Sequence, residues 1–338
     1  MEFLEYYKDK SILVTGGTGS IGKELVKRLV NMDIKILRIL DNNETALFDL
    51  GQELKSNKIR LLIGDIRDEE RLYRAMEGID IVFHAAALKH VPLCEYNPFD
   101  AVKTNILGTQ NLLSAALNQD VEKVITISTD KAANPANVMG ATKLLAERLT
   151  LAANSYKGNK RTAFSCVRFG NVIGSRGSVI PTFIRQIKEG GPVTITEPEM
   201  TRFIMRISKS VDLILKAGEF SKDGEIFILK MPVINIMDLA NCMIKYFSKS
   251  SVKAEEIPIK IIGKRPGEKL FEELMTDLES EQAYENDEMF IVKTGNNGVF
   301  NCPEGFLKTT RKKYLSSDQA LLTESEILNI LESCNFES

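Results

Sequence analysis

The sequence is poor in features that mark membrane, secreted, metal-binding and nucleic-acid-binding proteins. No apolar run approaches the roughly 20 residues that span a bilayer, and the amino terminus is acidic where a signal peptide is basic. The five cysteines are scattered and include no Cys-x-x-Cys pair, so neither a disulfide framework nor a zinc site is indicated. A formal charge of −2, with acidic and basic residues mixed, offers no basic surface to a nucleic acid. We therefore expect a cytoplasmic protein with no membrane, metal or nucleic-acid partner.

The sequence does contain an alternation of short β-branched runs and longer amphipathic stretches between residue 10 and about residue 170. The runs predicted as buried strands are Ser11 to Val14, Lys35 to Leu40, Arg60 to Ile63, Asp80 to Phe83, Lys123 to Ile127 and Ala163 to Val167. The stretches predicted as helices are Ile21 to Val30, Arg71 to Met76 and Leu144 to Ala153. This alternation predicts an α/β fold with a doubly wound parallel sheet, the Rossmann architecture.

Beyond Arg168 the pattern shortens and is interrupted by glycine and proline. We expect residues 1–170 to form the domain with the parallel sheet, with later segments returning to it. Residues 171–338 are expected to form mainly a smaller mixed α/β domain that binds the substrate. Near the end of the chain, Thr323 and Glu326 predict a capping box that opens a last helix.

A glycine-rich turn, Thr15-Gly16-Gly17-Thr18-Gly19-Ser20-Ile21-Gly22, follows the first predicted strand and precedes an amphipathic helix. In such a turn the missing side chains let the backbone approach a pyrophosphate at a helix amino terminus. The candidate cofactor residues in the turn are Gly16, Thr18, Gly19, Ser20, Ile21 and Gly22. The turn therefore predicts a dinucleotide cofactor.

The end of the second predicted strand indicates which dinucleotide. Asp41 lies 19 residues after Gly22, close to the usual offset for a carboxylate that binds the adenosine ribose. It would accept from both ribose hydroxyls and repel a 2′-phosphate, so we expect NAD rather than NADP. The alternative is that Asp41 merely caps a helix that begins at Glu44.

The ends of the third and fourth predicted strands extend this cofactor site. Asp65 and Ile66 are expected near the adenine, although an ordinary loop aspartate is nearly as good an interpretation. Ala85 and Ala87 have small side chains that suit close passage of the cofactor. His84 precedes them, and we interpret it as a packed structural residue.

The reacting centre is predicted after the fifth strand, at Thr129, Asp130 and Lys131. Ten residues beyond Thr129 a helix carries Met139 and Lys143. The spacing resembles that of the extended short-chain dehydrogenases, which place Ser or Thr at the first point and Tyr-x-x-x-Lys at the second. Here methionine replaces the tyrosine that ordinarily takes the hydroxyl proton.

More of the chain resembles the bacterial UDP-N-acetylglucosamine 4,6-dehydratases. The shared motifs are Thr129-Asp130-Lys131, Ala87-Leu88-Lys89-His90-Val91-Pro92, Glu95-Tyr96-Asn97-Pro98, Asn134-Pro135, Arg168-Phe169-Gly170-Asn171-Val172, Gly174-Ser175-Arg176-Gly177-Ser178-Val179, Met200-Thr201-Arg202-Phe203 and Arg265-Pro266-Gly267-Glu268-Lys269. The long members of that family resemble this chain in having methionine at the tyrosine point. The resemblance implies UDP-N-acetylglucosamine as substrate, retention of configuration at carbon 5, and a homo-oligomer.

The dehydration implied by this resemblance needs an acid and a base. Our hypothesis is that Lys131 removes the carbon 5 proton, with its pKa lowered by burial, and that Asp130, helped by Thr129, protonates the departing hydroxyl. The alternative is that Asp130 and Lys131 form a surface ion pair. Met139 is expected to pack, and Lys143 to bind the nicotinamide ribose rather than extend into solvent.

The same resemblance assigns the nucleotide-sugar site. Asn171, Arg202, Arg265 and Glu268 match family positions that hold the uridine diphosphate. Lys89, His90 and Arg176 are further candidates for which a solvated loop is an equal alternative. The competing functions are a 4,6-dehydratase that inverts carbon 5, a UDP-sugar 4-epimerase, and a catalytically silent NAD-binding regulator.

Overall fold

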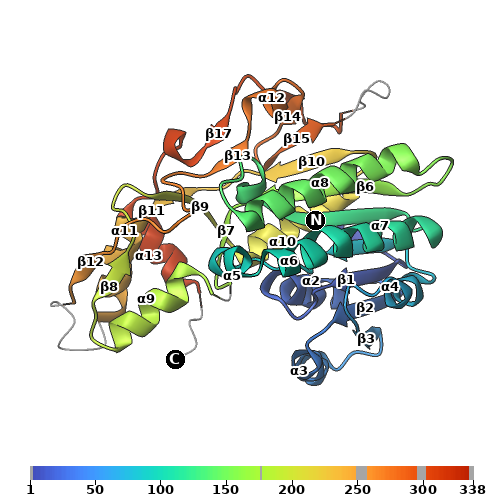
Figure 1. The fold of residues 1–338 in the computed structure, drawn as a ribbon, viewed down its shortest axis with the longest axis horizontal. Helices are drawn as coiled ribbons and strands as arrows, with labels where there is room; N and C mark the ends of the chain where they lie inside the picture. Colours follow the sequence, from blue (N-terminus) through green and yellow to red (C-terminus); the bar gives the residue numbers. More distant parts are fainter. Residues whose placement is uncertain (1–2, 176, 249–256, 295–301, 335–338) are drawn as a thin grey trace.

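A central sheet of ten strands organises the computed structural model, which describes residues 3–175, 177–248, 257–294 and 302–334 (Figure 1). The strand order is β16-β14-β15-β10-β6-β5-β4-β1-β2-β3. The seven strands from β3 to β10 pair in parallel: β1 (Ser11–Thr15), β2 (Ile36–Asp41), β3 (Ile59–Ile63), β4 (Ile81–His84), β5 (Lys123–Thr129), β6 (Ala163–Phe169) and β10 (Glu225–Leu229). Three antiparallel strands complete the sheet: β15 (Met289–Lys293), β14 (Ala283–Glu285) and β16 (Leu307–Lys308).

Helices cover both faces of this sheet, so its central strands are buried on both sides. Along β1, Ile12 and Val14 join the apolar cluster of one face, whereas Leu13 joins the cluster of the other. The first face is covered by α1 (Phe3–Tyr6), α2 (Ser20–Val30), α3 (Glu44–Leu54) and α10 (Ile207–Phe220). The second face is covered by α4 (Glu69–Met76), α7 (Gly108–Asn118) and α8 (Val138–Tyr156). The predicted α/β fold with a doubly wound parallel sheet is confirmed.

Individual elements follow the prediction closely in the first half of the chain. All six predicted strands are present, with ends that differ by one or two residues. The prediction that Arg60 to Ile63 is buried is wrong, because β3 is the edge strand of the sheet and Leu61 and Ile63 are 40% and 57% exposed. Helix α8 begins at Val138, next to the predicted helical position of Met139, because the side chain of Asn137 caps it, accepting from the N–H of Gly140 at 2.8 Å. The capping box of Thr323 and Glu326 is present at the start of α13 (Glu324–Glu332). The predicted helices do not include α5 (Val91–Tyr96), α6 (Pro98–Ala101), the π-helical segment Val102–Leu107 or α7.

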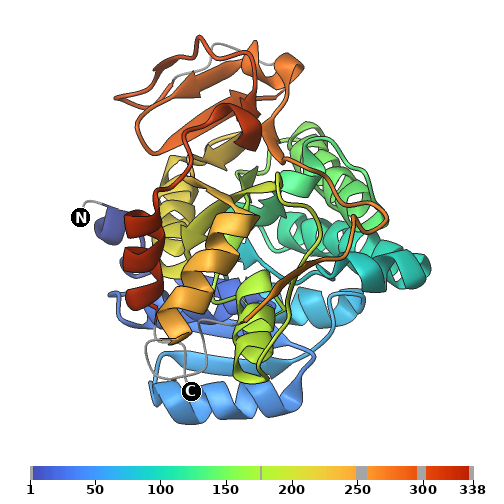
Figure 2. The ribbon, with the colours of Figure 1, turned by 90° about the vertical axis from the view of Figure 1, so that its left-hand side faces the viewer.

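A smaller lobe lies beside the carboxyl ends of the parallel strands (Figures 1 and 2). It is built from β7 (Asn171–Ile173), α9 (Val179–Lys188), β8 (Val193–Ile195), β9 (Thr201–Arg206), β11 (Val233–Asn235), α11 (Ile236–Ser248), β12 (Ile259–Ile261) and α13. Its apolar core includes Phe183, Ile195, Leu239 and Ile327. Between β9 and β11 the chain returns to the large sheet through α10 and β10, so the two parts are interwoven. The division at residue 170 stays a prediction.

A third group of short elements connects the lobe with the antiparallel edge of the large sheet. It comprises β13 (Glu273–Met275), α12 (Asp277–Ser280) and β17 (Tyr314–Leu315). β13 pairs with β17 and lies against the short 3-10 turn Asp130–Ala132 that follows β5. The segment before β13 is thereby held close to the predicted reacting centre.

Candidate active site

A cavity of about 420 Å³ lies at the carboxyl ends of β1 to β4, where the sheet order changes direction. Its lining includes eight of the predicted cofactor residues: Gly16, Thr18, Gly19, Asp41, Asp65, Ile66, Ala85 and Ala87. Ser20, Ile21 and Gly22 lie in the first turn of α2 and do not line it. Arg67 also lines this cavity and was not predicted from the sequence.

The glycine turn in this cavity fits a pyrophosphate. Gly16 has a φ of +65°, and a Cβ atom there would lie 2.6 Å from the N atom of Ala86. A Cβ atom at Gly22 would lie 2.1 Å from the carbonyl oxygen of Gly16. Both positions therefore require glycine, and the N-cap of α2 is Gly19, which brings no side chain between the first N–H groups of the helix and an anion.

Asp41 is turned toward this glycine turn. Its Oδ2 atom accepts from the N–H and the hydroxyl of Thr18 at 3.0 and 2.7 Å. Helix α3 is capped instead by Asn43, which accepts from the N–H of Ala46 at 3.0 Å. The alternative that Asp41 caps this helix is therefore wrong.

The far end of the same cavity carries an ion pair between Asp65 and Arg67. The Nη2 atom of Arg67 lies 2.6 Å from Oδ2 of Asp65, and this hydrogen-bonded contact holds the pKa of the carboxyl group below its ordinary value. Because Asp65 balances the charge of Arg67, the guanidinium group is not a free cation beside Asp41.

His84 is a buried structural residue between two threonines. Its Nδ1 atom lies 2.8 Å from Oγ1 of Thr15, and its Nε2 atom lies 3.0 Å from Oγ1 of Thr109. Since the hydroxyl of Thr109 donates to the carbonyl oxygen of Asn105, Nε2 carries the proton and Nδ1 accepts. Burial, with a smaller contribution from Lys143, lowers the pKa of His84 to about 3, so the ring is neutral at neutral pH.

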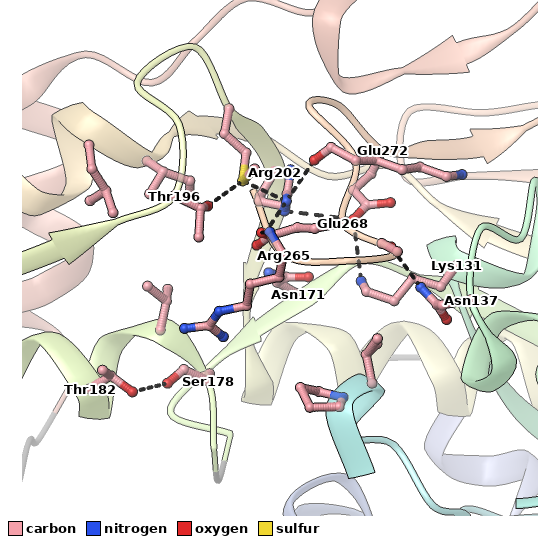
Figure 3. A pocket seen from close by; sticks show the side chains of 18 of the residues that line it. Lys131, Asn137, Asn171, Ser178, Thr182, Thr196, Arg202, Arg265, Glu268 and Glu272 are labelled. Atoms are coloured by element: carbon pink, nitrogen blue, oxygen red, sulfur yellow. Dashed lines mark hydrogen bonds and ion pairs between the residues drawn. The ribbon is translucent and has the colours of Figure 1, made fainter. Parts of the chain in front are cut away.

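A second cavity, of about 320 Å³, lies between the large sheet and the smaller lobe (Figure 3). Five predicted residues line it: Lys131, Asn171, Arg202, Arg265 and Glu268. The start of α5, the amino-terminal half of α9 and the segment 265–272 form its walls. The topology thus brings together residues from positions 91 to 272 of the chain.

Asp130 and Lys131 form an ion pair at the tip of β5, in which Asp130 is buried and Lys131 is half-buried. Oδ1 of Asp130 accepts from the hydroxyl of Thr129 at 2.6 Å and from Nζ of Lys131 at 3.0 Å. The Asp130 side chain is fully buried, so the alternative of a surface ion pair is wrong. Its Oδ2 atom is buried too and has no hydrogen-bond partner among the described residues.

The electrostatics of Lys131 correct one expectation. Burial by itself lowers the pKa of Lys131, as the sequence analysis supposed, but the carboxylates of Asp130 and Glu272 outweigh burial. The net effect raises the pKa of Lys131, and at neutral pH the amine carries a proton. A lysine in this environment needs a proton acceptor before it can act as a base.

The two predicted arginines differ in their surroundings. Arg202 is buried, and its guanidinium group donates to the carbonyl oxygens of Thr201, Lys269 and Leu270 at 2.7, 2.9 and 3.2 Å. The guanidinium group of Arg265 extends into the cavity and makes no hydrogen bond or ion pair with any residue that the structure describes (Figure 3). Arg265 is thus the arginine that is available to a ligand.

Two residues from the sequence motif on α8 lie away from both cavities. Met139 is buried and packs against Cys94 and Ala101, in agreement with the packing role expected for it. Lys143 is buried as well, and its Nζ atom donates to the carbonyl oxygen of Ile127 at 2.6 Å. Burial lowers the pKa of Lys143, and the alternative of a solvated helix lysine is wrong.

The remaining candidates contribute less to the site. Lys89 and His90 are exposed and do not line either cavity. The ring of His90 lies against the turn at Gly177, where a Cβ atom would be 2.3 Å from its Cε1 atom. Arg176 lies outside the described residues. Within the described part of the chain, no group of three His, Cys, Asp or Glu side chains is arranged to hold a metal ion.

Sequence comparisons place this chain among proteins of polysaccharide biosynthesis. The sequence profile of the family described as "Polysaccharide biosynthesis protein" matches residues 12–294. A protein of Methanocaldococcus jannaschii, named as an uncharacterized membrane protein, is 58% identical over 98% of both chains. A UDP-glucose 4-epimerase of Rickettsia rickettsii is 44% identical over 82% of this chain and 81% of its own. The capsular polysaccharide biosynthesis protein CapD of Staphylococcus aureus is 45% identical over 82% of this chain but only 47% of its own length.

One of these names corrects an expectation. We expected a cytoplasmic protein without a membrane partner, but the relative from Methanocaldococcus jannaschii is named a membrane protein. Among the described residues, no helix combines the length and apolar character needed to cross a bilayer. The assignment to the cytoplasm is therefore withdrawn.

Solved structures support the same placement. The X-ray structure of Pen from Bacillus thuringiensis is 45% identical, with a TM-score of 0.91 over 98% of this chain and 99% of that chain. A dTDP-glucose 4,6-dehydratase from Streptomyces venezuelae with NAD and TYD bound shares the fold, with a TM-score of 0.67 and 22% identity over 77% of this chain and 86% of that chain. This chain belongs to the polysaccharide biosynthesis protein family and has the fold of nucleotide-sugar epimerases and dehydratases of the short-chain dehydrogenase/reductase type.

Proposed function

We propose that this protein is an NAD-dependent UDP-N-acetylglucosamine 4,6-dehydratase that forms a UDP-4-keto-6-deoxy-N-acetylhexosamine. The observation that carries the proposal is the pair of buried Asp130 and half-buried Lys131, with Nζ of Lys131 facing the cavity that Arg265 enters. An acid and an amine side by side suit an elimination of water, in which one group takes a proton and the other gives one. Simple hydride transfer needs only one such group.

The chain's own residues divide the proton transfers between them. A bound nicotinamide would supply the hydride chemistry that oxidation at carbon 4 and reduction at carbon 6 require. Oδ2 of Asp130 is buried and has no hydrogen-bond partner in the described part of the chain. It receives the carbon 4 hydroxyl proton in place of the tyrosine that Met139 replaces, and passes it to the departing hydroxyl at carbon 6. Thr129 holds the other oxygen of Asp130 in place. Lys131 removes the carbon 5 proton, which the new ketone at carbon 4 has made acidic.

The cofactor residues support NAD. Gly16, Gly19 and the start of α2 would hold the pyrophosphate, and Asp41 would accept from the ribose hydroxyls. A 2′-phosphate would meet the carboxylate of Asp41. Lys143 is proposed to bind the nicotinamide ribose, exchanging its bond to Ile127 for one to the sugar.

The cavity between the large sheet and the smaller lobe supports a nucleotide sugar. The guanidinium group of Arg265 is suited to the diphosphate oxygens. Arg202 and Glu268 shape the wall beside it, and Asn171 offers an amide group from β7. We propose retention at carbon 5 because Lys131 can return the proton to the face from which it took it.

The product of the purified protein with UDP-N-acetylglucosamine and NAD tests the proposal. We expect a product that has lost one water, with NMR couplings of the retained hexose. Asp130→Asn and Lys131→Ala are each expected to lower kcat by about 100-fold or more while the variants stay folded and still bind NAD. Parent rates in either variant would refute the residue assignment, and couplings of the inverted hexose would identify the 5-inverting dehydratase.

A UDP-sugar 4-epimerase is the second candidate, and the name of the Rickettsia relative favours it. An epimerase needs the same cofactor but no acid–base pair for carbons 5 and 6. In the same experiment it would give a new isomer of unchanged mass. An unchanged substrate would instead favour a silent NAD-binding regulator.

A further inference from the structure

Glu272 is a buried carboxyl group at the reacting centre that sequence reasoning did not identify. It lies just before β13 and is only 3% exposed. Its Oε1 atom is 3.6 Å from Nζ of Lys131 and 3.6 Å from Nε of Arg202 (Figure 3). Its Oε2 atom is buried and accepts no hydrogen bond from the described residues. Glu272 thus places a buried carboxyl group, with one oxygen that accepts no hydrogen bond from the described residues, beside the predicted base Lys131.

The charges around this group favour a shared proton. Burial raises the pKa of Glu272 above its ordinary value, although cations lie close to it. The pKa of Lys131 is raised as well, by Asp130 and Glu272 against the opposite effect of burial. The charged or titratable groups that face the pair are Asp130, Arg202, Glu268 and Lys269. A protonated Lys131 cannot remove a proton from carbon 5, so its proton needs a place to go.

We infer that Glu272 is a positioning residue that takes this proton from Lys131 when substrate occupies the cavity. This inference rests on the proposed function. One N–H bond of Lys131 breaks and one O–H bond of Glu272 forms, so the ammonium–carboxylate pair becomes an amine and a carboxylic acid. No proton leaves the cluster, and the lone pair on Nζ becomes available to carbon 5.

Exclusion of water from the cavity favours the proton transfer from Lys131 to Glu272. A substrate that fills the cavity removes the solvent that reaches Lys131, whose side chain is 25% exposed. Two opposite charges lose more solvation on burial than a neutral pair does, so burial shifts the proton toward Glu272. Arg202 does not depend on the charge of Glu272, because its guanidinium group also donates to the carbonyl oxygens of Thr201, Lys269 and Leu270.

Lys131 and Glu272 can together carry out the proton transfers at carbon 5 over a complete turnover. After Lys131 has taken the carbon 5 proton and water has left, carbon 5 needs a proton again as the hydride returns to carbon 6. Lys131 gives its proton back and is neutral once more. Glu272 keeps its own proton until the product leaves.

The pH dependence of kcat in Glu272→Gln tests this inference. In the parent the proton moves within the cluster, so we expect kcat to change little between about pH 6 and pH 9. In Glu272→Gln, Lys131 must release its proton to solvent, and each pH unit below its pKa leaves about ten times less neutral amine. The kcat of the variant is therefore expected to be low at pH 6 and to rise about tenfold per pH unit until the pKa of Lys131 is passed.

Glu273→Gln is the matched control, because Glu273 is the next residue and its carboxylate accepts from Asn134 at 3.2 Å and from no other side chain within the described ranges. This control should keep the flat profile of the parent.

A Glu272→Gln variant with unchanged kcat, or with the same loss at every pH, would overturn the inference. Should Glu272→Gln fail to fold, Glu272→Asp keeps an ionisable acceptor and should keep a flat profile at lower kcat; a rise with pH would overturn the inference. Absence of dehydration in the parent would overturn the proposed function together with the inference, whereas parent turnover with a flat Glu272→Gln profile overturns the inference alone.

Discussion

At the scale of single residues, the sequence identified the side chains but not their environments. Thr129, Asp130 and Lys131 were predicted as neighbours because they are consecutive at a strand end. The raised pKa of Lys131 could not be predicted, since it depends on Glu272 as well as on the adjacent Asp130, and Glu272 is 141 positions away in the sequence. Nothing in the run around Glu272 marks it, because only the packing of β13 against the turn after β5 brings it to Lys131.

The two arginines of the cavity give a prediction at this scale. Arg265 has no protein partner for its guanidinium group among the described residues, so Arg265→Ala should remove only contacts to the ligand. Hydrogen bonds to charged groups contribute about 1.5–3 kcal/mol, so we expect KM for the UDP-sugar to rise about 10- to 100-fold with kcat and the unfolding midpoint nearly unchanged. Steady-state kinetics and thermal unfolding measure this. Lys264→Ala removes the exposed neighbouring cation and should leave KM alone; an equal rise in both variants would argue against a specific contact.

At the scale of elements, prediction succeeded where the hydrophobic pattern is strong. The central parallel strands β1, β4, β5, β6 and β10 are buried on both faces, which gives apolar runs that are easy to identify. The segment of α5 and α6 was missed because its large apolar side chains are outside: Leu93, Tyr96 and Phe99 are 62%, 87% and 80% exposed. The antiparallel strands β14 and β16 have three and two residues, too few for a periodic signal.

A buried ion cluster that joins α8, β6 and α12 gives a prediction at the element scale. Arg168 is fully buried, and its guanidinium group donates to both carboxylate oxygens of Glu147 and of Glu279 at 2.6 to 3.0 Å. Burial raises the pKa of Glu279, but Arg168 outweighs burial and the net pKa lies below the ordinary 4.5. A carboxyl group whose pKa is lower in the folded than in the unfolded chain stabilises the fold above about pH 4.5, and that stability is lost as the pH falls through its folded pKa.

Glu279→Gln is accordingly expected to lower the free energy of unfolding by about 1–3 kcal/mol at neutral pH. The difference from the parent should shrink as the pH falls below about 4. Urea unfolding at several pH values measures both effects. Asp277→Asn, on the exposed side of the same short helix, is the control and should change little. A difference that stays constant down to low pH would mean that the charge of Glu279 is not responsible.

At the scale of the whole molecule, the predicted substrate cavity is formed by two parts of the chain that meet. Asn137 at the start of α8 donates to the carbonyl oxygen of Gly267 at 3.0 Å, and Lys269 donates to the carbonyl oxygen of Asn134. The amide group of Asn134 in turn donates to Glu273 at 3.2 Å. These contacts tie the segment 265–272 to the large sheet across the edge of the cavity. A ligand in the cavity would add a second connection between the same parts.

UDP binding is therefore expected to stabilise both walls together. At a concentration about 100 times its Kd, UDP should raise the free energy of unfolding by about 2.7 kcal/mol. Hydrogen exchange should slow in residues 131–137, in residues 179–183 of α9 and in residues 265–272, all of which line or border the cavity. Helix α3 lies at the far edge of the large sheet and should exchange as before (Figure 1). In Arg265→Ala the protection at the same UDP concentration should fall on both walls, because a ligand that bridges them loses affinity as a unit. Protection confined to one wall would mean that UDP binds on one part of the chain without bridging to the other.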